Sequence, residues 1–105
     1  MILERRMSAR KPVKQEVMII HDEGHRLCQI HNLSLNGAML KVGWGALHRD
    51  VPVQMTITLP ASKERLPYRL SAVVARVTKD GTAIKFHELD ANAKNALQWY
   101  LQVAQ

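Results

Sequence analysis

The sequence predicts an all-β fold with one C-terminal helix, built as a six-stranded antiparallel β-barrel. Short apolar–polar alternations recur up to residue 87, turn signals join them into hairpins, and helical spacing begins only after residue 90. The length of 105 residues and the hydrophobic fraction of 47% fit a single domain that buries its own core.

The first half of the chain contains three predicted strands. The β-rich segments 13–20 and 26–33 flank the polar stretch HDEGH, and this arrangement predicts a hairpin. The segment GAMLKV at 37–42 is the third strand. We interpret residues 1–12 as a flexible basic arm, so the folded domain is expected to span 13–105.

The second half adds three more strands. The segment 51–59 places apolar residues at every second position, which is typical of a half-buried strand. The segment 66–79 is a long strand, bent or bulged near Ser71. The DG pair at 80–81 predicts a hairpin turn that leads into a last strand at 82–87.

A helix over about 90–103 follows, with Asp90 as its predicted N-cap. Trp99 falls to one side of the apolar stripe, where it either covers the end of the barrel or forms a docking face for a partner or a second copy. The stripe itself consists of residues at helical spacing, namely Ala93, Leu97, Tyr100, Leu101 and Ala104.

The charge is concentrated near the start of the chain. Fifteen Lys and Arg against nine Asp and Glu give a net charge of +6, and five of the basic residues lie within the first 14. Such an arm is either a solvated terminus or a site that attracts phosphates. Nucleic acid, an anionic membrane and a small phosphorylated ligand are all compatible with it.

Two features of the sequence indicate the cellular compartment. Cys28 is the single cysteine, which argues against a disulfide framework or a cysteine metal cluster and fits a reducing compartment. The sequence has no signal-peptide pattern and no run approaching the roughly 18 apolar residues of a membrane span. We therefore expect a soluble, cytoplasmic protein.

Patterns for metal binding and catalysis are weak. In HDEGH the acid Glu23 stands between His21 and His25 and a glycine follows it, so the zinc-protease pattern on a helix is not formed. Cys28 and His31 are three apart and point to opposite faces of a strand, which favours a small buried cysteine over a nucleophile. We expect no enzyme, no metal and no cofactor.

Two arginines in the arm form the first candidate binding group. Arg6 and Arg10 frame the segment RMSAR, and Pro12 disfavours a helix just after it. In an extended arm the two guanidinium groups can straddle a ligand, bind phosphate or the O6/N7 edge of guanine in bidentate fashion, and stack on a base.

The segment NLSLNG forms the second candidate group. Asn32 offers an amide and Ser34 a hydroxyl, and both are expected on the same side of a strand. Gly37 permits either a positive φ or a close backbone approach. A turn is one interpretation of this segment, and a platform for a base edge and ribose-phosphate is the other.

The two groups together resemble the PilZ domain family. Its signature is Arg-x-x-x-Arg in an N-terminal arm, then Asp/Asn-x-Ser-x-x-Gly. Arg6, Arg10, Asn32, Ser34 and Gly37 fill all five positions, with 21 residues between Arg10 and Asn32. The segments GAMLKV and AVVARVTKDGTAIKFHEL are also similar to the family, so the resemblance covers nearly the whole chain.

The resemblance implies a PilZ-like split barrel that binds cyclic di-GMP, a bacterial second messenger, without catalysis. Members of the family control motility, adhesion and biofilm polysaccharide through a partner protein. Arg5 is a possible third arginine contact or else a solvated charge. The glycine usual before the final Ile-x-Phe is Ala83 here, and this departure concerns strand packing.

Two rival functions use the same fold. A basic nucleic-acid-binding barrel would interleave aromatic and basic residues along a strand, but the one Phe, two Tyr and two Trp show no such pattern. A PilZ-like protein–protein adaptor that has lost the nucleotide would still keep the fold. The complete motifs argue for the receptor.

Overall fold

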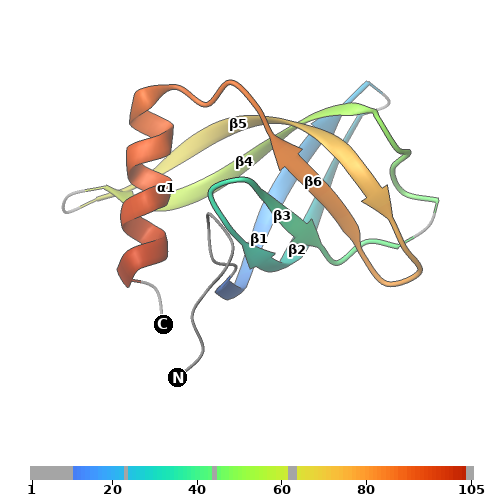
Figure 1. Cartoon of the computed structure of the whole chain (residues 1–105), viewed down its shortest axis with the longest axis horizontal. Helices are drawn as coiled ribbons and strands as arrows, with labels where there is room; N and C mark the ends of the chain where they lie inside the picture. Colours follow the sequence, from blue (N-terminus) through green and yellow to red (C-terminus); the bar gives the residue numbers. More distant parts are fainter. Residues whose placement is uncertain (1–10, 23, 44, 62–63, 104–105) are drawn as a thin grey trace.

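The computed structural model describes the chain except for residues 1–10, 23, 44, 62–63 and 104–105. Six antiparallel strands close into a barrel in the order β1-β2-β3-β6-β5-β4, and α1 lies at one end of it (Figure 1). The fold class predicted from the sequence is confirmed. The elements are β1 (Lys11–His21), β2 (Gly24–Leu33), β3 (Gly37–Leu40), β4 (Pro52–Ala61), β5 (Glu64–Val77), β6 (Thr82–Phe86) and α1 (Ala91–Val103).

The first hairpin is longer than its apolar pattern predicts. β1 begins at Lys11, so Lys11 and Pro12 belong to the strand although the sequence assigned them to the arm. The register runs from Lys11 opposite Leu33 to His21 opposite Gly24, with an irregularity between Pro12 and Gln15. Backbone pairing extends past the last apolar residue because ladder hydrogen bonds do not depend on side-chain hydropathy.

The bulge in β5 lies later than expected. Ser71 itself pairs regularly with Gln54, and the bulge predicted near it lies a few residues further along the strand. The register with β6 shifts instead between Val74 and Arg76, just after the ladder with β4 ends at Val73. The extra residue of a bulge bends its strand, and here the bend falls where β5 continues along β6 alone.

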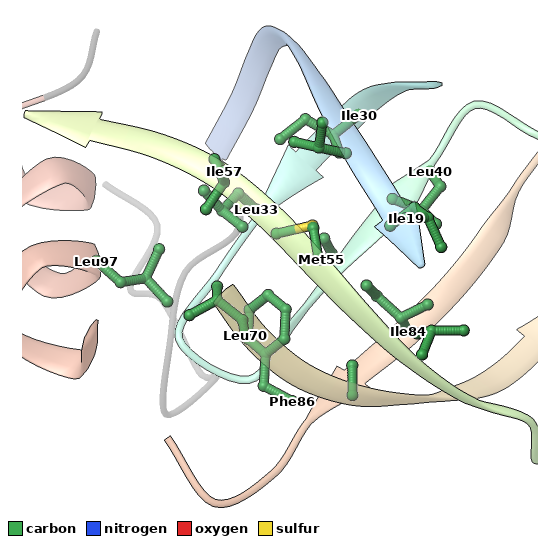
Figure 2. Close-up of a cluster of buried hydrophobic side chains, with 14 of the residues drawn as sticks. Ile19, Ile30, Leu33, Leu40, Met55, Ile57, Leu70, Ile84, Phe86 and Leu97 are labelled. Carbon is green, nitrogen blue, oxygen red and sulfur yellow. The ribbon is translucent and has the colours of Figure 1, made fainter. Parts of the chain in front are cut away.

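The core fills the inside of the barrel and continues under the helix. Along β4 the residues at every second position are buried, as the alternation predicts, because inward and outward side chains alternate along a barrel strand. Figure 2 shows Leu97 of α1 pointing toward the side chains that the strands direct inward. The largest fully buried side chains include Ile19, Ile30, Leu33, Leu40, Met55, Ile57, Leu59, Leu70 and Leu97.

The helix begins as its sequence predicts. The backbone N–H of Ala93 donates to Oδ1 of Asp90 at 2.7 Å, so Asp90 is the N-cap. Leu97 and Leu101 are buried against the barrel, whereas Trp99 keeps 48% of its surface exposed. This exposure fits a docking face, which stays a prediction. Ala104 lies outside the described residues.

The helix also joins the two strands that close the barrel. β1 pairs with β4 over only three residues, from Met18 to Ile20. Nearer the start of β1, Nε2 of Gln15 donates to the carbonyl oxygen of Thr58 at 2.9 Å. The hydroxyl of Tyr100 donates to Oε1 of Gln15 at 3.5 Å. Side chains therefore continue the link between β1 and β4 where the backbone ladder has ended.

Within the described part of the chain, no helix has the length and apolar character needed to cross a membrane.

Candidate functional site

The motif segment forms a tight turn between β2 and β3. The backbone N–H of Ser34 donates to the carbonyl oxygen of Gly37 at 2.9 Å. The hydroxyl oxygen of Ser34 accepts the N–H groups of Asn36 at 3.1 Å and Gly37 at 3.2 Å. The same hydroxyl lies 3.3 Å from the carbonyl oxygen of Gly37, to which it donates. One serine side chain thus joins three backbone groups of the turn.

Ser34 lies in a turn, and not in the strand where the sequence analysis placed it beside Asn32. We expected its hydroxyl to stand beside Asn32 on one side of a strand, but β2 ends at Leu33 and Ser34 lies in the turn. Leu33 and Ser34 are both buried, so the alternation stops at the end of the strand. Ser34 is only 2% exposed, and its hydroxyl is already bonded within the turn, where it fixes the backbone that follows Asn32.

Gly37 is required by a close backbone approach, one of the two alternatives the sequence left open. Gly37 is not among the residues with a positive φ. A Cβ atom at this position would collide with the carbonyl oxygen of Ile84 and lie 3.2 Å from Cα of Lys85. Gly37 pairs with Lys85 in the ladder between β3 and β6. The glycine of the motif therefore allows the turn to pack against β6.

Asn32 connects the second motif to the start of the folded chain. It is half-buried in β2 and pairs with Pro12 of β1 on one side and with Met39 of β3 on the other. The neighbouring pair is Lys11 with Leu33. The segment that ends at Arg10 consequently joins the barrel beside Asn32.

The arginines of the first motif lie outside the described residues. This applies to Arg5, Arg6 and Arg10, so their contacts stay a prediction. The structure places the residue that follows Arg10 directly opposite the second motif, which is the arrangement that a shared site needs.

A hollow of about 480 Å³ borders the turn. Sequence reasoning missed the residues on its far wall, because pairing of β3 with β6 brings them to the turn from more than 45 positions away. In this wall Glu88 has a φ of 55°, and its Oε1 lies 3.7 Å from Nδ1 of His87. The lining residues are Leu35, Asn36, Phe86, His87, Glu88, Leu89 and Lys94.

The remaining candidate groups are separate from this site. Cys28 is buried, as predicted, and burial raises the pKa of its thiol; Glu16 adds to the increase and Arg26 opposes it. His31 is exposed, as the strand spacing predicted. Glu23 of the HDEGH turn lies outside the described residues. Among the residues that are described, no three His, Cys, Asp or Glu side chains group closely enough to hold a metal ion.

Comparisons with known proteins agree with the fold. The profile of the PilZ domain matches residues 4–102. The inhibitor of motility MotI/DgrA from Bacillus subtilis superimposes with a TM-score of 0.77 and 20% identity, over 95% of this chain and 51% of that one. The PilZ domain of CeSA from a cellulose synthesizing bacterium gives a TM-score of 0.70 and 20% identity, over 92% and 99% of the two chains.

The extent of these matches differs between the two structures. The chain spans about half the length of MotI/DgrA and nearly all of the CeSA domain. No curated protein sequence matches the chain.

Proposed function

The chain belongs to the PilZ domain family, and from this premise we propose that it is a non-catalytic receptor for cyclic di-GMP. Arg6 and Arg10, with Arg5 beside them, would bind the phosphates and guanine edges of the ligand. Asn32 and the Ser34–Gly37 turn would form the opposite wall. Ordering of the arm over the ligand would then create a surface that a partner protein recognises.

The observation that carries this proposal is the register of β1 with β2. Lys11 pairs with Leu33, and Pro12 pairs with Asn32. Arg10 and Arg6 precede Lys11 by one and five residues. These stretches span at most about 3.5 Å and 18 Å of extended chain, so both arginines can reach the turn. In this proposal the two halves of the motif, with 21 residues between them in sequence, meet at one end of the barrel.

The chemistry of the two walls suits a ligand with two phosphates and two guanines. Guanidinium groups neutralise phosphate and pair with the O6/N7 edge of guanine. Asn32 is uncharged, so it brings no carboxylate next to the phosphates. In this proposal Ser34 and Gly37 act mainly through the backbone of the turn, because the Ser34 hydroxyl already has partners.

The proposed output passes from the arm to a protein partner. Gln15, in the same strand as the base of the arm, is hydrogen bonded to Tyr100 of α1. Trp99, one residue earlier in α1, is exposed and offers an aromatic contact. Since MotI/DgrA is an inhibitor of motility and CeSA comes from a cellulose synthesizing bacterium, we include motility and polysaccharide formation among the regulated processes. A cytoplasmic location and a homodimer are compatible parts of this proposal.

Titration calorimetry of the full chain with cyclic di-GMP tests the proposal, with GTP as the control ligand. The stoichiometry distinguishes one bound molecule from an intercalated pair. Arg6→Ala and Arg10→Ala should each weaken binding roughly 10- to 100-fold, because each removes a charge-assisted contact. Arg49→Ala, an exposed arginine in the loop after β3, is the matched control and should bind like wild type. No heat with cyclic di-GMP, or unchanged affinity in both arm variants, would contradict the receptor function.

One observation favours a second function, that of a protein–protein adaptor without a nucleotide. The Ser34 hydroxyl has two donors and one acceptor within its own turn, so it needs no ligand to be satisfied. A chain that gives no heat with cyclic di-GMP, yet loses a partner when Trp99 is replaced by Ala, would be an adaptor.

A further inference from the structure

The hollow beside the motif turn lies between two parts of the fold that the sequence motifs do not connect. One wall is Leu35 and Asn36, the two central residues of the turn. The other wall is the segment His87–Leu89 after β6, together with Lys94 from the first turns of α1. Its volume of about 480 Å³ falls in the usual range for small-molecule sites, which is roughly 300–1,000 Å³.

The walls of this hollow combine apolar and charged groups. Leu35 and Leu89 are half-buried and give two apolar surfaces. Lys94 is exposed on the helix and places a cation at the hollow, while Glu88 places a carboxylate there. The Glu88 side chain is 88% exposed, and its Oε1 lies 3.7 Å from Nδ1 of His87. Apolar faces with one cation and one anion are the groups that a nucleotide base and its phosphate require.

We propose that this hollow receives one guanine nucleotide half of cyclic di-GMP, with Lys94 binding its phosphate. The inference rests on the proposed function and extends it to residues outside both motifs. Leu35 and Leu89 contact the faces of the base. Glu88 accepts hydrogen bonds from the amino group of guanine, a donor that adenine lacks at that edge.

The motif turn gives this hollow a fixed wall. Leu35 and Asn36 are held between Ser34 and Gly37, whose backbones are joined by the hydrogen bonds of the turn. Gly37 in turn packs against β6, the strand that leads directly into His87. Both walls are thus fixed to one ladder, so the hollow exists before any ligand arrives. A site of this kind loses little free energy to ordering of its walls.

The charge of Lys94 can be tested against a matched lysine at the other end of the barrel. Lys79 is exposed in the turn between β5 and β6, and Figure 1 shows this turn far from α1. By calorimetry, Lys94→Gln should weaken cyclic di-GMP binding about tenfold, the loss of one charge-assisted contact, and Lys79→Gln should leave it unchanged. Both variants should unfold at the wild-type temperature, because both side chains are on the surface.

The outcomes separate the two proposals. If wild type binds and Lys94→Gln binds equally well, the inference is wrong while the receptor function stands. If wild type itself gives no heat, both fail. If Lys79→Gln weakened cyclic di-GMP binding as much as Lys94→Gln, the loss would come from the net charge alone. The proposed role of the hollow would then be wrong.

A second measurement does not depend on the lysine variants. In an NMR titration with cyclic di-GMP, the amides of Leu35, His87 and Leu89 should shift in step with binding. Glu88→Gln should also narrow the difference in affinity between cyclic di-GMP and cyclic di-AMP, about threefold or more, from the loss of one charged acceptor. Unmoved amides, or an unchanged preference for guanine, would show that the ligand lies elsewhere on the barrel.

Discussion

Two hairpin turns at opposite ends of the barrel have the same hydrogen bonds. In the motif turn Ser34 bonds to Gly37, and in the turn between β5 and β6 Thr78 bonds to Gly81. In both turns the hydroxyl oxygen also accepts the N–H of the glycine, at 3.2 Å and 3.1 Å. The sequences SLNG and TKDG are therefore two versions of one turn, a hydroxyl residue followed three positions later by glycine.

The surroundings of the two turns differ. Ser34 is buried and Thr78 is exposed. A Cβ on Gly37 would meet the backbone of β6, whereas on Gly81 it would first meet the Sδ atom of Met39 at 2.9 Å. The comparison shows that the Ser-x-x-Gly half of the binding motif is first a way of making a tight turn. What distinguishes the candidate site is its burial, the neighbouring Asn32 and the adjoining arm.

The largest expected effect is that of an alanine at the buried glycine. Gly37→Ala should lower the free energy of unfolding by about 3 kcal/mol or more, because the carbonyl of Ile84 cannot move without breaking the ladder. Gly81→Ala should cost less, about 1–2 kcal/mol. The end of the Met39 side chain can rotate away, and the carbonyl oxygen of Leu40, at 3.2 Å, has to move by only a few tenths of an ångström. Urea unfolding followed by circular dichroism measures both. Similar losses in the two variants would refute the distinction.

Removing the hydroxyl of Ser34 or of Thr78 should also destabilise the motif turn more than the other turn. The difference in the free energy of unfolding should be smaller than for the glycines. Ser34→Ala leaves the buried N–H of Gly37 without its acceptor and should cost about 2 kcal/mol. Thr78→Ala should cost about 0.5 kcal/mol, because Thr78 is exposed and water can take the place of its hydroxyl. The same unfolding experiment applies. A Thr78 variant as unstable as the Ser34 variant would mean that burial does not separate the turns.

Replacing Asn32 should affect ligand binding more than the stability of the fold, unlike replacing Gly37 or Ser34. Asn32→Ala should weaken cyclic di-GMP binding about fivefold, in line with the loss of one neutral hydrogen bond. Calorimetry of this variant, with thermal unfolding to confirm the fold, measures the effect. Wild-type affinity would assign Asn32 to the structure of the barrel instead of to the ligand.

The smallest effect is expected when the central residues of the motif turn are transferred to the other turn. Lys79→Leu with Asp80→Asn makes the sequence of the exposed turn TLNG, and the stability should change by about 0.5 kcal/mol or less. The stoichiometry of cyclic di-GMP should not rise, because Asn32 and Lys11, from which the arm extends, pair in the ladder of β1 with β2 and not beside this turn. An added binding site would show that the turn alone is sufficient.

Local patterns in the sequence predicted the fold well. The alternation in β4, the DG turn and the Asp90 cap each depend on neighbouring residues, and all three are confirmed. The bulge was misplaced because its position is set by where β5 leaves β4, which is a property of the closed sheet. The resemblance of the two motifs to the PilZ family identified which kind of barrel the strands form, and local patterns alone did not specify this.

The site was predictable only in part. The positions of Asn32 and Gly37 follow from the motif, but the engagement of Ser34 within its own turn does not, because strand alternation was extended one residue too far. Lys94 and Glu88 carry no signal in the sequence. They reach the turn through the pairing of β3 with β6 and the direction in which α1 leaves the barrel.

The short ladder between β1 and β4 makes closure of the barrel uneven. Three residue pairs join these strands, against ten between β4 and β5. With the ladder between β2 and β3, which also has three pairs, this is one of the two shortest ladders of the barrel. Its opening would break the hydrogen bonds from Gln15 to Thr58 and from Tyr100 to Gln15 in one event. Gln15 of β1 and Tyr100 of α1 meet at this seam between β1 and β4. A ligand that fixes β1 should therefore slow amide exchange in α1.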